Sequence, residues 1–295
     1  MAQSWDLRML LGLTSLPPLG PSIARQAIIR WRDSIYAQLS REPLRFRDEL
    51  RSCAGIICGS AIIRALEASP DDPKPWKPHE YDIFVPRATF KAFCAFVQRE
   101  CEGNITDRAH FAQTSNPHIG ERRIIRTPVA VLCVYATRDP CPLVAIAASP
   151  LNIQLSFLSA DTLCVAYPWA VYYKHATSRP GPTTDDTPET RETALHQTYA
   201  RRGYNFRALQ KRASGNCLQH GMCPKQTRHF GDDSCMTIVF HDASEPRPNV
   251  RPSKDNLHMT ASWVFGGQAC GNATCAYGIQ SSVHSAMVCS DHPLF

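Results

Sequence analysis

The stretch that most constrains the fold is residues 80–85, where two carboxylates introduce a short apolar run. Side chains alternate along a strand, so Glu80 and Asp82 would share one face, where like charges repel unless a cation or a basic group lies between them. The run that follows, Ile83 to Val85, is apolar on both faces, as in a buried strand. A solvated strand end, neutralised by Lys74 or Lys77 of the preceding loop, is the other interpretation.

Apolar periodicity predicts regular elements on both sides of this strand. Helical spacing is found at residues 21–39, 46–51, 61–67, 87–100 and 192–211, and short apolar or alternating runs predict strands at 54–58, 81–85, 129–135 and 151–155. Because helices and strands are interleaved, we expect an α/β (α+β) fold with a mixed sheet flanked by helices.

Polar and proline-rich segments predict how the chain is divided. Residues 179–190 combine prolines with acidic and hydroxyl side chains and are typical of a linker. We expect, in chain order, an N-terminal helical extension (1–45), a sheet domain (46–178), this linker (179–190), a helical Cys/His-rich region (191–245) and a partly flexible tail (246–295).

Composition argues against membrane and secreted classes. The 295 residues are 43% hydrophobic and 20% charged, which is ordinary for a globular protein. No run reaches the roughly 18 uninterrupted apolar residues of a membrane helix, and no secretory signal pattern is recognised. The 13 cysteines are therefore expected to be reduced. We expect a soluble, intracellular protein of the cytoplasm or nucleus, with no membrane partner.

A Gly-Ser pair, Gly59 and Ser60, separates the first predicted strand from the following helix. Glycine lets the backbone approach a phosphate, and a serine hydroxyl and a helix N-terminus offer hydrogen-bond donors to it. Paired carboxylates on a neighbouring strand suit Mg²⁺, and two such ions can clamp an in-line nucleotidyl displacement. A tight turn in which Ser60 only caps the helix explains the same pair without a ligand.

This order of strand, Gly-Ser turn, helix and E-x-D strand resembles the nucleotidyltransferase fold of the polymerase-β-like superfamily, over roughly residues 46–160. The runs GSAIIRAL, WKPHEYDIFVP, YARRGYNFR and CPKQTR are also similar to a large group of uncharacterised fungal proteins with this fold. The resemblance implies that Gly59 and Ser60 bind nucleotide phosphates. It also implies that Glu80 and Asp82 are the catalytic ligands of Mg²⁺ or Mn²⁺.

The sequence departs from the family in one respect. An active member resembling this family needs a third carboxylate on a later strand, whereas the strand predicted at 151–155 offers the amides of Asn152 and Gln154. Amides are weaker, neutral metal ligands. The nearest acid, Asp161, follows that strand. The resemblance thus implies a nucleotide-binding protein that either transfers a nucleotidyl group to an unidentified acceptor or is a pseudoenzyme with a degenerate site.

A second function class rests on the basic segment 199–228, which contains seven Lys or Arg residues and no acid. A solvated surface is the simpler interpretation, and contact with an anion or a nucleic acid is the other. In this class the chain is a non-enzymatic interaction module that binds a protein partner or a nucleic acid through the basic segment and the Cys-rich C-terminal region.

Three cysteines within that region, Cys217, Cys223 and Cys235, could form a tetrahedral zinc site with His220 or His229. The spacing lacks the paired C-x2-C of a standard zinc finger. A buried cysteine cluster and a disulfide therefore stay open as alternatives.

Overall fold

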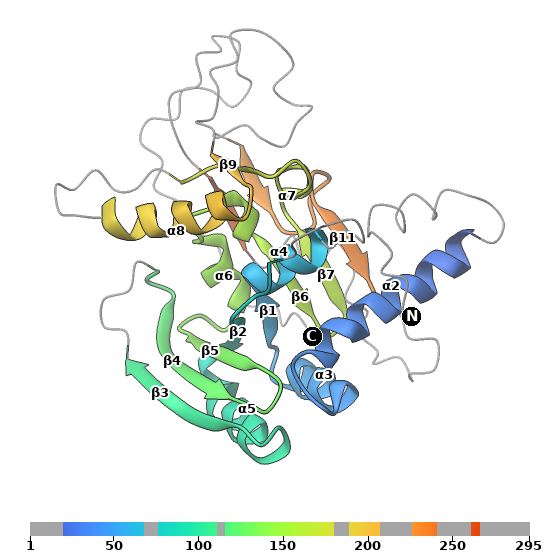
Figure 1. Ribbon diagram of the computed structural model, residues 1–295, viewed down its shortest axis with the longest axis vertical. Coiled ribbons are helices and arrows are strands. Elements are labelled where there is room, and N and C mark those ends of the chain that lie inside the picture. The colour runs from blue at the N-terminus through green and yellow to red at the C-terminus, as the bar shows by residue number, and fades with distance from the viewer. Residues whose placement is uncertain are drawn as a thin grey trace, which may run out of the picture.

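The computed structural model describes residues 20–67, 76–110, 116–179, 189–206, 226–240 and 261–265. These residues form a mixed α/β fold built on one large sheet with helices packed against it (Figure 1). The predicted fold class is confirmed at this level. No helix within the described ranges is long and apolar enough to cross a membrane.

Eight strands form the large sheet. They are β1 (Ile56–Cys58), β2 (Tyr81–Pro86), β3 (Asn104–His110), β4 (Ile119–Arg126), β5 (Val131–Thr137), β6 (Ser156–Ser159), β7 (Thr162–Val165) and β11 (Met236–Val239). Their order across the sheet is β11-β7-β6-β1-β2-β5-β4-β3. All neighbours in it are antiparallel except β2 and β5, which are parallel.

Two small sheets lie outside the large one. In the first, β8 (His175–Ala176) pairs with β9 (Asn205–Phe206), and in the second, β10 (Thr227–His229) pairs with β12 (Ser262–Val264). One strand of the large sheet, β11, comes from the part of the chain that follows the predicted linker at residues 179–190. The predicted domain boundaries themselves stay predictions.

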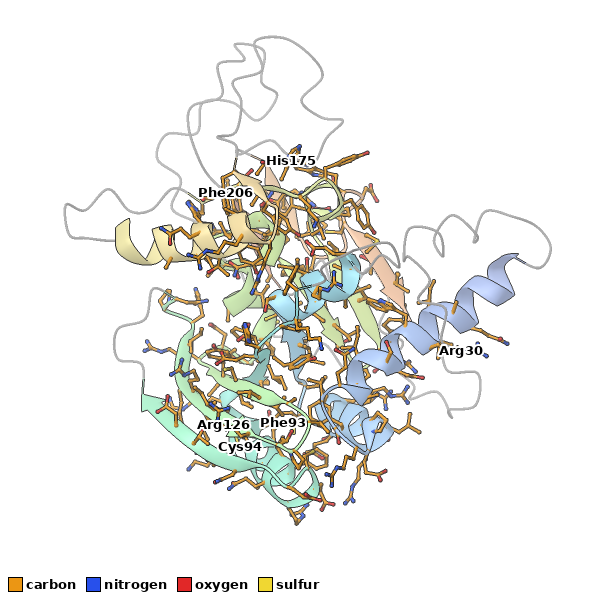
Figure 2. All side chains as sticks on the ribbon, in the orientation of Figure 1. Arg30, Phe93, Cys94, Arg126, His175 and Phe206 are labelled. Atoms are coloured by element: carbon orange, nitrogen blue, oxygen red, sulfur yellow. The ribbon has the colours of Figure 1, made fainter. Side chains whose placement is uncertain are left out.

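The described helices are α2 (Gly20–Ala37), α3 (Pro43–Ser52), α4 (Ser60–Glu67), α5 (Arg87–Glu100), α6 (Pro142–Ala147), α7 (Pro168–Tyr172) and α8 (Glu189–Arg201), with a short 3-10 helix η1 (Asn152–Gln154). In Figure 1, α8 and α2 project on opposite sides of the body, and α4 crosses its centre. Figure 2 shows Phe93 and Cys94 of α5 within the body, whereas Arg30 of α2 points away from it.

The core lies where the central strands meet α4 and α5. Ile57 of β1, Ile63 of α4 and Ile83 of β2 are fully buried, as are Phe90 and Phe93 of α5. The three residues of β1 are all buried, and its backbone pairs with β2 on one side and with β6 on the other. The turn that follows β1 therefore starts from the centre of the large sheet.

Most predicted elements are present, and one is wrong. The helix predicted at 87–100 is α5, and the helices expected at 21–39, 46–51 and 61–67 match α2, α3 and α4 to within a few residues. The strand predicted at 151–155 is instead η1. Asn152 uses its side-chain Oδ1 to accept the backbone N–H of Thr177 at 2.9 Å, which takes the place of strand pairing.

The helix predicted at 192–211 ends at Arg201, because Gly203 then turns the chain with a φ of +87° into β9. Residues 207–211 lie outside the described ranges. Strands β3 and β4 were not predicted, since the charged residues of β4 interrupt the apolar alternation that would indicate a strand.

Candidate functional site

The turn from β1 into α4 lies directly beside the acidic end of β2. The two strands are antiparallel, with Cys58 opposite Asp82, so the next residue, Gly59, reaches the Asp82 side chain. Gly59 has a φ of +73°, and a Cβ built on it would overlap with Oδ2 of Asp82. Only glycine satisfies both conditions. The predicted juxtaposition of the Gly-Ser turn with the acidic strand is present.

The Asp82 carboxyl group is largely withdrawn from water. Burial raises the pKa of Asp82 to about 7. A hydrogen bond from the Tyr135 hydroxyl and the positive charge of Arg122 act in the opposite direction, and the negative charge of Glu80 adds to the rise. Asp82 therefore carries a proton for much of the time at neutral pH.

Tyr135 and Arg122 reach Asp82 because neighbouring strands bring them to one face of the sheet. Phe84 of β2 is opposite Tyr135 of β5, and their rings stack with centroids 4.7 Å apart. Tyr135 is in turn opposite Arg122 of β4. The guanidinium of Arg122 donates to Asp107 of β3 at 2.8 Å, which leaves its charge to act on Asp82 from a distance.

Glu80 lies at the open end of this face. Its side chain is exposed, and its Oε2 accepts a hydrogen bond from the Cys133 thiol at 3.1 Å. Cys133 is also the β5 residue opposite Asp82. The two carboxylates thus share a face, as strand alternation predicts, with a thiol beside them. Of the two lysines predicted to neutralise the pair, Lys74 lies outside the described residues and Lys77 is exposed. Among the described residues, the cation whose charge lowers the pKa of Asp82 is Arg122.

The third carboxylate has no counterpart on the strand next to β2. β5 presents Cys133 and Tyr135 on the face of Asp82. Asp161 instead accepts two hydrogen bonds from Arg51, at 2.9 and 2.7 Å. It follows Ser159, which pairs with Ile56 at the end of β1 away from Gly59. Asp161 is therefore placed to anchor α3 and not to complete the acidic pair.

The described residues contain no group of three or more His, Cys, Asp or Glu side chains arranged to hold a metal ion. The cost of burying the Asp82 carboxyl group is met by protonating it near neutral pH. A divalent ion bound here would have to displace that proton and complete its coordination shell with water and ligand oxygens.

One side of the site is formed by α8, which sequence reasoning did not connect with it. Tyr199 of α8 is fully buried, hydrogen-bonds with Gln154 of η1, and lies near enough to Asp82 for their charges to interact. Burial raises the pKa of Tyr199 above its usual range. The guanidinium of Arg202 stacks over the rings of Trp76 and Tyr199, 4.0 and 4.9 Å from their centroids.

Tyr135 could have been found from the sequence. The strand VLCVYAT places Cys133 and Tyr135 two residues apart within an otherwise apolar run, and alternation sends both to one face. Arg122 and Tyr199 carry no such signal, because their approach to Asp82 depends on which strand pairs with β5 and where α8 packs.

Of the predicted zinc ligands, Cys235 and His229 are within the described ranges, whereas Cys217, Cys223 and His220 are outside them. Cys235 lies beside Cys164 of β7, with which it shares a hydrogen bond. The zinc site itself therefore stays a prediction.

Arg228, counted with the basic segment, is a core residue. It is 1% exposed, its Nη2 donates to Oδ1 of Asp232 at 2.9 Å, and its guanidinium lies over the Tyr167 ring at 4.8 Å. Arg228 thus contributes to packing and not to a basic surface, while residues 207–225 lie outside the described ranges.

The chain was also compared with known proteins. No protein-family model, no curated protein and no solved structure matches it.

Proposed function

We propose that the chain is a nucleotidyltransferase-like protein that binds a nucleotide at the Gly59–Ser60 turn with one divalent ion, and that it is a pseudoenzyme. The observation that carries the proposal is the contact between the Gly59 backbone and the Asp82 carboxyl group. It brings the N-terminus of α4 and the Ser60 hydroxyl, which suit phosphate oxygens, next to two carboxylates, which suit Mg²⁺.

The acidic pair supports binding better than turnover. A two-metal displacement must balance two divalent charges while both ions hold the attacking and leaving oxygens. Here Glu80 and Asp82 supply at most two negative charges, and Asp82 gives up its proton only near pH 7. Cys133 and Tyr135 add no carboxylate. One ion bridging the pair and a triphosphate is the arrangement that this charge supports.

The proposal is tested by measuring the melting temperature (Tm) with each of the four ribonucleoside triphosphates, with Mg²⁺ or Mn²⁺, at pH 6 and pH 8. A ligand that binds only the folded state raises its stability, by about 2.7 kcal/mol at a hundred times the dissociation constant. We expect one or more nucleotides to raise the Tm only with metal, and more at pH 8, because the ion must displace the proton of Asp82.

Two variants locate the site. Ser60→Ala removes the hydroxyl proposed to bind phosphate, and Glu80→Gln removes an exposed metal ligand, so both should reduce the ligand-induced rise in Tm. Ser52→Ala, an exposed serine at the end of α3, is the matched control and should not. Absence of any rise with all four nucleotides at both pH values contradicts nucleotide binding, and incorporation of labelled nucleotide into an acceptor contradicts the pseudoenzyme.

A further inference from the structure

Two cysteines from distant parts of the sequence meet at the edge of the large sheet. β7 and β11 are antiparallel, with Cys164 opposite Thr237. Cys235 comes two residues before Thr237, so alternation places its side chain on the same face as Thr237 and Cys164. The two sulfur atoms are joined by a hydrogen bond. None of the cysteines in the described ranges is in a disulfide.

Polar groups surround this pair, although it lies at the edge of the core. The Thr237 hydroxyl donates to Sγ of Cys164 at 3.6 Å, and Nη2 of Arg228 donates to Sγ of Cys235 at 3.6 Å. The Cys235 thiol also donates to the carbonyl of His229 at 3.5 Å. The hydrogen bond with Cys164 and burial raise the pKa of the Cys235 thiol, and the Arg228 guanidinium opposes them only in part. Burial also acts to raise the pKa of Cys164, but its hydrogen bonds with Cys235 and Thr237 lower it, so Cys164 is the sulfur that favours the thiolate, the reactive form of cysteine.

The two sulfurs differ in their access to solvent. Cys164 is fully buried, whereas Cys235, in the turn that leads into β11, is only partly buried. A small oxidant therefore meets Cys235 first, and Cys164 is already in position to react with the product. Exposure and a neighbouring second thiol are the features that favour reversible cysteine oxidation.

We propose that Cys164 and Cys235 form a peroxide-sensitive pair that closes to a disulfide. The inference is independent of the nucleotide site. It also gives Cys235 a partner in β7, some seventy residues earlier in the chain, whereas the sequence alone had pointed to Cys217 and Cys223.

The chemistry balances with hydrogen peroxide as the oxidant. The Cys235 thiol loses its proton and attacks one peroxide oxygen, the O–O bond breaks, and Cys235 becomes a sulfenic acid while the hydroxide that leaves takes up that proton. The Cys164 sulfur then attacks the Cys235 sulfur, the S–O bond breaks, and the departing hydroxide takes up the Cys164 proton. Two thiols and one peroxide give one disulfide and two waters.

The test uses the full chain, reduced and then treated with stoichiometric hydrogen peroxide. After alkylation of the remaining thiols, peptide mapping without reductant should show one cross-linked species joining the peptides of Cys164 and Cys235, with the loss of two hydrogens. The bond closes a long loop of the unfolded chain, so the Tm should rise by about 5 °C and return to its initial value with dithiothreitol.

Three variants define the pair. Cys235→Ser and Cys164→Ser should each abolish the cross-link and the rise in Tm. Cys94→Ser, which alters a fully buried cysteine of α5, is the matched control and should keep both. If Cys164→Ser fails to fold, the result with Cys235→Ser decides, because the Cys235 side chain is only partly buried and its replacement disturbs the core less.

Several results would overturn the proposal. They are a cross-link from Cys235 to a different cysteine, oxidation of Cys235 to sulfinic acid with Cys164 still alkylated, and zinc retained by the purified protein with no cross-link formed.

Discussion

Asp82 and Asp232 are both largely shielded from water, yet the pKa values of their carboxyl groups move in opposite directions. Burial raises both. At Asp232 the hydrogen bonds and charge of Arg228 more than offset the effect of burial, and the pKa of its carboxyl group is lowered from the usual value. At Asp82 the Tyr135 hydroxyl and the distant charge of Arg122 do not offset the effect of burial, and the pKa rises to about 7.

The difference separates a structural carboxylate from one available to a ligand. Asp232 has its counter-ion in direct contact, and it also accepts backbone N–H groups of His229 and Ser234 at 3.3 and 3.0 Å. Asp82 instead accepts a hydrogen bond from the Tyr135 hydroxyl. It lies against the Gly59 turn, where a side chain on Gly59 would overlap with the carboxyl group. The first region is complete within the chain, whereas the second is the one at which we propose that a cation binds.

The largest expected effect comes from Arg228→Met. Removing one member of a buried ion pair leaves the other charge uncompensated, which costs about 3–5 kcal/mol. Urea unfolding at pH 7.5 measures it. Arg51→Met, which breaks a pair with Asp161 whose side chains are 26% and 22% exposed, is the matched control and should cost about 1 kcal/mol. Equal losses of unfolding free energy in the two variants would show that burial does not make the Arg228–Asp232 pair more important for stability than the Arg51–Asp161 pair.

Gly59→Ala should destabilise the protein by about 2 kcal/mol, because φ is positive there and the new methyl group overlaps with Asp82. The cost should be smaller in an Asp82→Ala background, where the overlapping oxygen is gone. Gly120→Ala serves as the control, since a Cβ there meets its first atom only at 3.6 Å. A cost independent of residue 82 would contradict the close contact.

Asp82→Asn should stabilise the protein at pH 8 by about 2 kcal/mol and have little effect at pH 4, near the unfolded pKa. The folded-state pKa, about 7, lies above the unfolded value, so the stability that protonation of Asp82 contributes is present at low pH and is lost as pH rises through 7. Asparagine resembles the protonated acid and has no charge to desolvate. Chemical unfolding of both proteins at the two pH values measures the difference; the same difference at both would exclude the raised pKa.

At Asp232 the effect of the same Asp-to-Asn substitution on stability should depend on pH in the opposite direction. Its folded-state pKa is depressed, so its contribution to stability is present above pH 4 and is lost as pH falls through the folded value. Asp232→Asn should therefore destabilise the protein at pH 7 and less so at pH 3, which sharpens the contrast with Asp82.

The smallest effect is expected from Tyr135→Phe. The variant keeps the ring stacked on Phe84 but removes the hydroxyl that lowers the pKa of Asp82, so that pKa should rise further. Stability above pH 7 should fall by about 1 kcal/mol, with little change below pH 5. Carboxyl chemical shifts of Asp82 followed through a pH titration provide the measurement, and an unchanged midpoint would remove Tyr135 as its partner.

Sequence reasoning reached the parts of the site that depend on local pattern. Alternation placed Glu80 and Asp82 on one face, and the Gly-Ser pair marked the turn from strand to helix. Which strand lies beside β2 was not accessible, because β5 is reached only after an intervening hairpin of β3 and β4. The third acid was therefore expected at residues 151–155, on the β6 side of β1. The residues that lie beside Asp82 on β5 are instead Cys133 and Tyr135.

The edge strand β11 has a consequence for fragments of this protein. It covers β7 with four residue pairs, although some seventy residues of chain separate the two strands. A polypeptide ending at residue 190 would leave the backbone N–H and C=O groups of β7 unpaired beside an apolar core. Such an edge is a template for another chain. We expect that fragment to self-associate and aggregate, and addition of a peptide spanning residues 226–240 to suppress this by supplying the missing strand.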